Sequence, residues 1–510
     1  MIRRCVACIA CVAAGAMSAA AQVVQFRTAD SGIGPAILSR ALAAPHVQIG
    51  PGTVARVIRA GTIVNRSVIA LGRTVIVAGT IQGDVIVVGA NLYIHPGGRI
   101  DGRAIAMGGG VYESMLAHTG TVTVFDDFTY DIAPISGGYA LSYVALSGPI
   151  AVPAFTLGGF KGVEIPMYDR SNGLSLPLEM LIAVPHTPIH VEPSATYRSQ
   201  LGRLDPSLGA LAPLTRDVTA RVDVGRGTFT NDGWIWSDLV NSAEYFLAGD
   251  DTRNYYRAAR AQATVSGRWQ SAASTLAPYV AARLERATSV RPDSNATGGP
   301  WALTDRRSRD DVLRRNPAID PGTIFSVLVG AEWTGSTQGV NARGRIDEEV
   351  GSAPRLGASA PPSNTPPRAL GSNFAQTTFD GAIAFPTFGL QQLRVEAHAV
   401  ASLGSAPRQR WAYIGGPGTL PTLKLFERGG DRLIYVDARY DIPLVRVTLP
   451  LIGAPIVTLR ETLGGAGSSG FPTLAQATGV RLSAGFVDLD ILVDPVTRKR
   501  FVGAGLAFAR

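Results

Sequence analysis

Residues 409–443 read QRWAYIGGPGTLPTLKLFERGGDRLIYVDARYDIP and join two different patterns. The first half is rich in glycine and predicts a long structured loop, because glycine adopts left-handed backbone conformations at little cost. The second half alternates from Ile434 to Asp441 between apolar and charged residues, which predicts a strand with one apolar and one charged face. Repeated along a chain of 510 residues, this alternation is typical of a closed barrel in lipid, with apolar residues outward and polar residues inward.

Three further segments repeat the alternation, at 217–224, 259–269 and 392–403. Such runs reach about 9 to 13 residues, the length that a tilted strand needs to cross a bilayer. Strands of soluble sandwiches alternate as well, but they are usually about five or six residues long. We therefore expect residues 151–510 to form an antiparallel transmembrane β-barrel with an even number of strands, about 12 to 16 at roughly 22–28 residues per strand and connection.

The charged members of these runs are the candidates for the inner face of the barrel. In a membrane barrel the polar side chains hold the shape of the lumen or line its water, while the apolar side chains face lipid. The residues expected to face the lumen are Asp437, Arg439, Arg260, Arg268, Arg394 and Glu396.

The composition agrees with an all-β chain. Charged residues make up 17% of the sequence, which contains 58 glycines and 33 prolines, and this balance favours strands and turns over helical bundles. No run of about 18 apolar residues follows the N-terminal segment, so no transmembrane helix is expected. Without Arg3 and Arg4 the formal charge is 8 − 2 = +6, a mild excess that we interpret as ordinary surface charge.

Residues 1–21 have the three parts of a secretory signal peptide. Arg3 and Arg4 form the basic region, an apolar stretch follows, and an alanine run at 19–21 gives the cleavage site. All three cysteines of the chain lie inside this segment, so the exported chain is expected to have no disulfide, thiolate metal site or cysteine nucleophile. A lipoprotein anchor would need a cysteine directly after the cleavage site, and Cys11 has the wrong position and neighbours.

An internal repeat follows a linker expected at residues 22–47. Residues 79–89, GTIQGDVIVVG, recur 19 positions later at 98–108 as GRIDGRAIAMG. Short runs of Ile and Val with glycine at each corner predict a stack of about three coils that bury their apolar residues inward. Over residues 48–125 the repeat resembles the bactofilin (polymer-forming) β-helix; its shortness favours a rigid periplasmic spacer over a filament-forming module.

Several segments are expected to connect or cap these parts. Residues 126–150 are interpreted as a linker or plug, with an extra strand left open. The polar segments 305–316 and 351–371 are expected to be long loops at one end of the barrel. The basic residues of the first carry no interleaved aromatic residues, which favours a solvated loop over a nucleic-acid contact.

The last strand, at 500–508, resembles the C-terminal assembly signal of bacterial outer-membrane barrels, which ends on an aromatic residue. Ala509 and Arg510 follow it here, a small departure. The residues that carry this resemblance are Gly503, Leu506 and Phe508.

The motifs YIGGPGTL at 413–420, GGD at 429–431 and DARY at 437–440 are similar to the bacterial surface antigen superfamily of outer-membrane β-barrels, the assembly-factor and two-partner-secretion type. Segments 168–174 and 234–256 also resemble the barrel of this family, so the resemblance extends over about residues 155–510. It implies a loop that folds into the lumen. The inward-loop candidates are Gly415, Gly416, Gly418, Leu420, Gly429 and Gly430.

The chain departs from the family in two places. The resemblance implies an Arg-Gly-aromatic tip after the loop leucine, with the Arg held by acidic residues on the inner strand faces. Here Leu420 is followed by Pro421, Thr422 and Leu423, so we expect no guanidinium to lock the loop inside. The family's N-terminal polypeptide-binding domains are also absent, with the β-helix in their place, and both departures weaken an expectation of protein translocation.

The sequence predicts no catalytic set, and we expect the protein not to be an enzyme. It lacks a G-x-S-x-G turn at a strand–helix junction, an H-E-x-x-H motif and a phosphate-loop Lys. His186 and His190 have a spacing that a metal site could use, but surface histidines are the favoured interpretation. Asp488 and Asp490 share a strand face, where a lumen ion pair is favoured over acid–base work. No cofactor and no metal are expected.

The expected location is the outer membrane, with the N-terminal segment in the periplasm. The sequence favours an envelope structural or anchoring protein, and a transporter or protein-translocating or assembly pore is the alternative. A soluble envelope enzyme on a β-helix would need a far longer β-helix with an acidic groove. Expected partners are outer-membrane lipid and lipopolysaccharide, the barrel assembly machinery and a periplasmic protein or cell-wall partner of the β-helix, with no nucleic acid.

Overall fold

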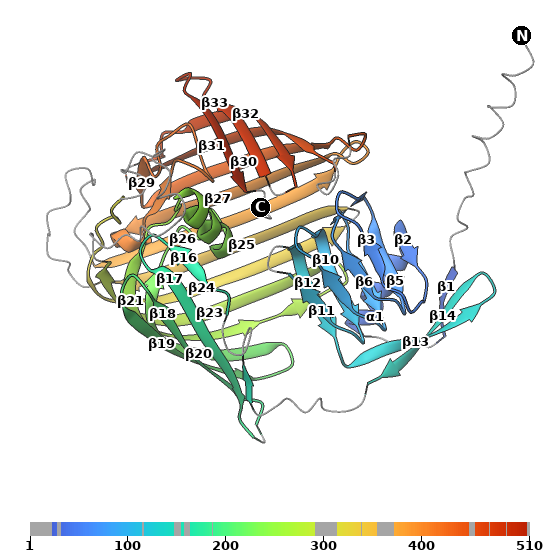
Figure 1. Ribbon diagram of the computed structural model, residues 1–510. Helices are drawn as coiled ribbons and strands as arrows, with labels where there is room; N and C mark the ends of the chain where they lie inside the picture. The colour runs from blue at the N-terminus through green and yellow to red at the C-terminus, as the bar shows by residue number, and fades with distance from the viewer. Residues whose placement is uncertain are drawn as a thin grey trace, which may run out of the picture.

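The computed structural model describes residues 23–27, 32–114, 117–146, 155–157, 164–185, 187–290, 314–337, 339–353, 372–447, 454–468, 470–485 and 487–506. A β-helical solenoid leads into a large antiparallel β-barrel (Figure 1). The predicted fold class, an all-β chain with a short β-helix before an antiparallel barrel, is confirmed. The helices of these residues, α1 (Ile33–Ala43) and α2 (Asp238–Ala248), are too short to span a membrane.

The solenoid consists of two facing parallel sheets. One sheet contains β2 (His46–Ile49), β5 (Ser67–Leu71), β8 (Val85–Val88), β10 (Arg99–Met107) and β12 (His118–Phe125). In the same sheet β7 (Thr80–Ile81) pairs with β10, and β4 (Ile63–Val64) pairs with β7. The other contains β3 (Arg56–Ile58), β6 (Val75–Val77), β9 (Leu92–Ile94) and β11 (Val111–Glu113).

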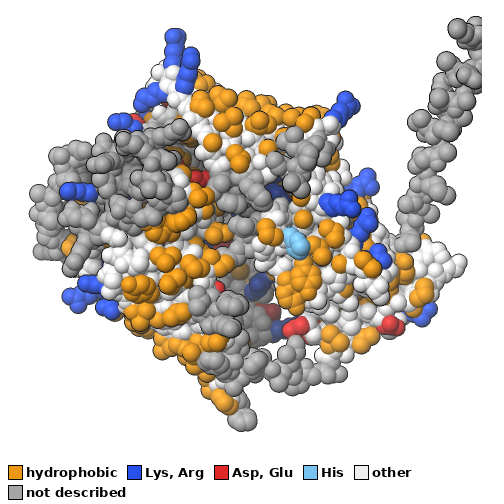
Figure 2. All heavy atoms as spheres, viewed as in Figure 1, with side chains coloured by type: hydrophobic (Ala, Val, Ile, Leu, Met, Phe, Trp, Pro, Cys, Tyr) orange, Lys and Arg blue, Asp and Glu red, His pale blue; other side chains and the backbone are white. Residues whose placement is uncertain are grey.

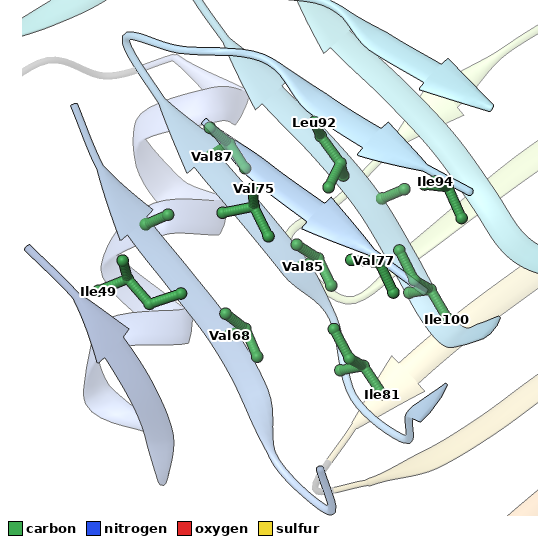
Figure 3. Packing of buried hydrophobic residues seen from close by; sticks show 12 residues of the cluster. Ile49, Val68, Val75, Val77, Ile81, Val85, Val87, Leu92, Ile94 and Ile100 are labelled. Carbon is green, nitrogen blue, oxygen red and sulfur yellow. The ribbon is translucent and has the colours of Figure 1, made fainter. Parts of the chain in front are cut away.

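The two copies of the sequence repeat lie in register, because Val85 pairs with Ala104 and Ile86 with Ile105. Val68, Val85 and Ala104 belong to a core between the two sheets (Figure 3). Their neighbours on the opposite face, such as Ile86 and Ile105, form a second core. Both faces of these strands are therefore buried, which explains the continuous apolar runs of the repeat.

The second core is covered by segments that the sequence did not assign to the β-helix. Residues 22–47, expected to be a linker, include β1 (Val23–Phe26) and α1, and the α1 residues Ile37 and Leu38 are buried in this core. Residues 126–150, left open between linker, plug and extra strand, contain the hairpin β13 (Phe128–Ile135) and β14 (Gly138–Ala145), to which β1 adds in parallel.

The barrel sheet has 18 strands in the described residues. In order they are β15 (Phe155–Leu157), β16 (Met167–Asp169), β17 (Gly173–Ala183), β18 (His190–Arg198), β19 (Arg203–Pro213), β20 (Val218–Phe229), β21 (Tyr256–Gly267), β22 (Trp269–Gln270), β23 (Ser274–Ser289), β24 (Gly322–Thr337), β25 (Val340–Ser352), β26 (Asn373–Pro386), β27 (Gln392–Gly404), β30 (Arg432–Pro443), β31 (Ile456–Gly467), β32 (Ala475–Ala484), β33 (Val487–Val493) and β34 (Arg500–Leu506).

These 18 strands occupy 16 positions. Both β15 and β16 pair with β17, at different points of its length. Both β21 and β22 pair with β23 in one unchanged register, because β22 continues the line of β21 after an interruption at Arg268. Two positions thus hold two strands each, and the even number of 16 lies within the predicted range.

The two faces of the barrel strands differ as the alternation predicts. Along β24, Ile324, Ser326 and Leu328 are buried, whereas Phe325, Val327 and Val329 are 40–56% exposed. Figure 2 shows hydrophobic side chains over the outer surface of the barrel, with Lys and Arg gathered at its margins. An exposed apolar face on strands of 10 to 16 residues, such as β32 and β23, suits contact with lipid better than contact with water.

The barrel has two structurally different ends. At the solenoid end, short turns contact the solenoid. At the far end, long connections fold over the barrel: the segment 230–255 that contains α2, residues 314–321, and residues 405–431 with η2 (Arg408–Arg410), β28 (Ala412–Ile414) and β29 (Arg428–Gly430). We name three connections the far-end cap: residues 230–255, residues 314–321 and the turn 170–172.

The first and last barrel strands both contact α2. The backbone N–H of Tyr168, in β16, donates to Ser242 Oγ of α2 at 2.6 Å, and the Tyr168 ring stacks on Tyr245 at 5.5 Å. On the other side, the Glu244 side chain lies beside Gly505 of β34. At this seam a helix, rather than another strand, satisfies a backbone group of the sheet edge.

Candidate functional site in the barrel lumen

The charged face of β30 carries a buried ion network. Asp437 is fully buried and accepts hydrogen bonds from Arg439 Nη2 at 2.6 Å and Arg460 Nη2 at 2.8 Å. Arg439 also donates to Glu396 of β27 at 3.1 Å. The three strands β27, β30 and β31 are therefore joined on their inner faces by a carboxylate held between two guanidinium groups.

Of the remaining lumen candidates, Arg394 lies beside this network, directly across from Arg439 in the pairing of β27 with β30. Arg260 pairs with Glu285 of β23 at 2.5 Å, and Arg394 pairs with Asp441 of β30 at 3.0 Å. Arg268 belongs to neither group: it lies exposed between β21 and β22. The structure thus brings Asp437, Arg439, Glu396 and Arg394 together on neighbouring strands and places Arg260 and Arg268 elsewhere.

The inward-loop candidates lie in residues 405–431, which we name the inward loop. Gly415, Gly416 and Gly418 have φ values of 124°, 83° and 87°, which residues with a side chain rarely adopt. Leu420 is fully buried. Gly429 and Gly430 lie in β29, which pairs with β28 within the loop.

The inward loop packs against the inner face of the barrel wall. Ile414 and Leu420 share a buried cluster with Val400 of β27, Leu433 of β30 and Ala477 of β32. Each of these wall residues lies on the buried side of its strand. The loop therefore occupies the lumen instead of extending beyond the far end.

Arg410 anchors this loop, and it corrects one sequence-based expectation. Its guanidinium donates to both Glu349 oxygens at 2.9 and 3.1 Å, and to Glu285 Oε1 and Tyr256 Oη at 3.1 and 3.0 Å. The expectation that no guanidinium holds the loop was wrong, because Arg410 lies ten residues before Leu420 rather than after it. A forked guanidinium between two carboxylates is a strong, directional anchor.

The far-end cap surrounds another buried guanidinium. Arg170 is fully buried and donates to the carbonyl oxygens of Arg314 and Arg253 at 2.6 and 2.8 Å and to Asn316 Oδ1 at 2.8 Å. The cap also meets the inward loop, since Arg408 N donates to Asp320 Oδ2 at 2.8 Å. Three connections that are distant in sequence are thus held together by polar contacts.

Asp232 introduces a titratable group into the cap. Its Oδ2 accepts from Asn254 N at 2.7 Å, but its Oδ1 has no hydrogen-bond partner among the described residues. Burial raises the pKa of this carboxyl from 3.8 to about 7, against the opposing effect of that hydrogen bond and of nearby Arg314 and Arg253.

A cavity of about 590 Å³ remains between the cap, the inward loop and the solenoid. Its wall includes Arg343, Arg345 and Asp380 from the barrel and Gly418 from the inward loop. Trp234 stacks on His398 inside it, with ring centres 4.1 Å apart. The space is polar, of mixed charge and large enough for water and small solutes.

The solenoid forms one wall of the same cavity through His118 and Gly120 of β12. The charge of Arg99, followed by burial, lowers the pKa of His118 to about 3, so this ring is neutral near pH 7. The lumen is therefore bounded at both ends by parts of this same chain.

The remaining candidate residues are the C-terminal signal residues, two histidines and two aspartates. Gly503 and Leu506 lie in β34, while Phe508 lies outside the described residues. His190 begins β18, and His186 also lies outside the described residues. Asp488 and Asp490 both pair with Arg481, at 3.3 and 2.7 Å. No group of three or more potential metal ligands occurs in the part of the chain that the structure describes.

Sequence reasoning missed Arg410, Arg170 and Trp234. Arg410 stands inside the stretch that identified the inward loop, but its partners lie 61 and 125 residues away and carry no local motif. Arg170 and Trp234 lie within segments singled out only for their family likeness. A search for charged residues directly before a glycine-rich loop would have found Arg410.

No model of a known protein family matches the chain, and no curated protein sequence matches it. Similar solved structures include CdiB from Acinetobacter baumannii, at 12% identity over 74% of this chain and 65% of that chain, with a TM-score of 0.37. Another is CdiB from Escherichia coli, at 14% identity over 74% and 67% of the two chains, with a TM-score of 0.38.

A third is the crystal structure of BamA from Haemophilus ducreyi lacking POTRA domains 1–3, at 9% identity over 75% and 73% of the two chains, with a TM-score of 0.41. The chain thus spans just under two thirds of the length of the A. baumannii CdiB chain. TM-scores below 0.5 assign neither a family nor a function, and the surface-antigen and bactofilin resemblances stay predictions.

Proposed function

We propose that this protein is a gated transport pore of the bacterial outer membrane, closed in the state described here. The observation that carries the proposal is the inward loop, which fills part of a charged lumen and is anchored there by Arg410. The strands of the barrel pair with one another independently of this loop, so the loop can leave the lumen without unfolding the barrel.

The outer surface supports the membrane location. Apolar side chains such as Phe325, Val329 and Ile346 are 51–56% exposed on strands long enough to cross a bilayer. Contact with outer-membrane lipid and lipopolysaccharide, insertion by the barrel assembly machinery and a periplasmic position of the solenoid belong to the same proposal. We assign the protein no catalytic role.

The proposed cargo is a polar solute or an extended polypeptide. The lumen wall carries both signs of charge, with Arg343 and Arg345 near Asp380 and Glu396, which suits a chain of mixed polarity better than an anion or a cation alone. Translocation of a polypeptide requires the inward loop to leave the lumen, since the cavity of about 590 Å³ is far smaller than a folded domain.

The structural or anchoring role that the sequence favoured gains less support. A barrel that serves only as an anchor has no need of a charged lumen cavity beneath a loop that an arginine anchors to the wall. A partner surface on the solenoid would be needed to restore that interpretation.

Solute flux from proteoliposomes tests the proposal. Arg410→Ala removes the anchor and leaves Glu349 without its main partner, at a cost of about 3–5 kcal/mol to the closed state. We expect release of a small entrapped dye at least tenfold faster than with the unmodified protein. The matched control is Arg345→Ala, which removes a half-exposed lumen guanidinium that does not touch the loop.

Heat-modifiable migration on gels establishes that each variant has folded. Equal and negligible flux through both folded variants and the unmodified protein would contradict the pore.

A further inference from the structure

The solenoid is docked on the barrel at the mouth opposite the far-end cap. Arg103 Nη1 donates to the carbonyl oxygen of Ala272 at 2.8 Å, in the turn between β22 and β23. Gln82 Nε2 donates to the carbonyl oxygen of Leu390 at 3.2 Å, in the turn between β26 and β27. Ala272 also packs against the second core of the solenoid.

Further contacts reach the strands between these turns. Asn341 Nδ2 of β25 donates to the carbonyl oxygen of Gln82 at 3.1 Å, and Gln392 Nε2 of β27 lies 3.5 Å from Asp101 Oδ2. Arg40 of α1 donates to Thr337 Oγ1 at 3.2 Å. The solenoid therefore follows the rim of the barrel across β22 to β27 (Figure 1).

Docking closes this mouth of the lumen. A small cavity of about 90 Å³ lies between β10 and β12 of the solenoid and β24 to β27 of the barrel. His118 and Gly120 of β12 line both this cavity and the larger lumen cavity. The outermost coil of the solenoid thus stands where a solute would leave the lumen.

Four ion pairs of the described residues near this interface join residues of the same unit, although Asp101 also interacts electrostatically with Arg394 across the interface. Within the solenoid, Arg99 pairs with Asp101 at 2.5 Å and Arg103 with Asp84 at 2.7 Å. Within the barrel, Arg394 pairs with Asp441 and Arg439 with Glu396. Separation therefore leaves these four ion pairs intact, and water can replace the hydrogen bonds that Arg103 and Gln82 donate to turn carbonyls.

The solenoid also has hydrophobic cores of its own. Its two hydrophobic cores lie between its sheets and beneath α1 and the β13–β14 hairpin, and Ala272 is the barrel residue that packs against them. This differs from the inward loop, whose buried residues pack on the barrel wall itself.

We propose that the solenoid is a movable plug that closes one mouth of the barrel and undocks as a rigid body when the pore opens. This inference rests on the proposed function and adds to it a second gate, at the end opposite the inward loop. The plug is part of this same chain, and its strands β10 and β12 provide the surface that closes the mouth.

A reversible cross-link tests the plug. From residue 12 onward the chain has no cysteine, so Gln82→Cys and Asn341→Cys introduce a unique pair across the interface. In the Arg410→Ala background, which removes the anchor of the inward loop, we expect oxidation to lower dye flux at least tenfold and reduction to restore it. The two single-cysteine variants serve as controls and are expected not to respond to oxidation.

Equal, measurable flux in the oxidised and reduced forms of the pair would contradict the plug proposal but not the pore proposal. If no variant supports flux in either redox state, the proposed function fails. A second measurement, which does not depend on flux, then tests whether the solenoid undocks. Gln392 is 1% exposed at the interface. We expect a cysteine in its place to react with a water-soluble maleimide at least tenfold faster when Asn341→Ala is also present, and equal protection in both variants would overturn the inference.

Discussion

At the scale of single residues, two guanidinium–carboxylate clusters have different structural roles. Asp437 between Arg439 and Arg460 ties neighbouring barrel strands together. Arg410 between Glu285 and Glu349 ties a loop to the wall. The first cluster holds strands that are also joined by backbone pairing, whereas the second is the main polar link between the loop and the strands it covers.

Replacing Asp437 by Asn is predicted to destabilise the barrel wall. The variant keeps the shape of the side chain but leaves Arg439 and Arg460 buried without their shared carboxylate, a loss of about 3–5 kcal/mol. The measurement is the temperature of the heat-modifiable transition in detergent. Glu332→Gln, which removes a half-exposed partner of Arg345, is the control and should change stability by less than about 1 kcal/mol.

An unchanged transition temperature for Asp437→Asn, together with an unchanged control, would show that the network does not stabilise the wall.

Residue pairs of this kind mark the limit of the sequence analysis. The alternation along residues 434–441 was sufficient to separate the charged face of β30 from its apolar face. It could not show which charges meet, because Asp437 and Glu396 are brought together by strand register across a long connection. Arg410 was missed for the same reason, since its carboxylates come from β23 and β25.

At the scale of elements, the far-end cap is a set of connections held by buried polar groups. No hydrophobic cluster of the described residues joins two of its segments, and Arg170, Asp251 and Asn316 connect them by hydrogen bonds. Such a cap is easier to open than a hydrophobic core, because water can satisfy the same groups.

The cap is predicted to loosen as pH rises, because of Asp232. A carboxyl whose pKa is raised by folding stabilises the folded form fully below 3.8, its pKa when unfolded, and loses that contribution as pH rises through about 7. The difference corresponds to at most roughly 4 kcal/mol. Asp232→Asn keeps the acceptor for Asn254 N and removes the titration, so this part of the pH dependence should disappear.

The measurement is the unfolding temperature of the folded barrel in detergent from pH 5 to pH 8, for the unmodified protein and for Asp232→Asn. Asp217→Asn, at an exposed turn of the solenoid end, is the control and should retain the pH dependence. Identical pH dependence in all three proteins would show that Asp232 does not cause the loss of stability at higher pH.

Element types were easier to predict than their contacts. The 19-residue repeat and the alternating strands have local periodicities, and these determined the order of solenoid and barrel. Helix α1 was expected to be part of a linker because its segment is short and rich in alanine and glycine, and its helical state depends on burial of Ile37 and Leu38 against the solenoid. Tertiary packing of that kind has no signature in a short segment.

At the scale of the whole molecule, the chain closes its own lumen from both ends. The inward loop and the far-end cap cover one mouth, and the solenoid covers the other, with a cavity of about 590 Å³ between them. The central claim is that this closed arrangement is one state of a pore. The sequence could not predict it, because neither the docking of the solenoid nor the fold of the loop is visible in a local pattern.

Single-channel recording in planar lipid bilayers tests this claim most directly. The unmodified protein is predicted to be closed for most of the time with brief openings, and Arg410→Ala is predicted to raise the open fraction at least tenfold at the same single-channel conductance. The same conductance is expected because the strands that form the wall are unchanged. An absence of current in both proteins, or the same current with the same open fraction in both, would contradict the account.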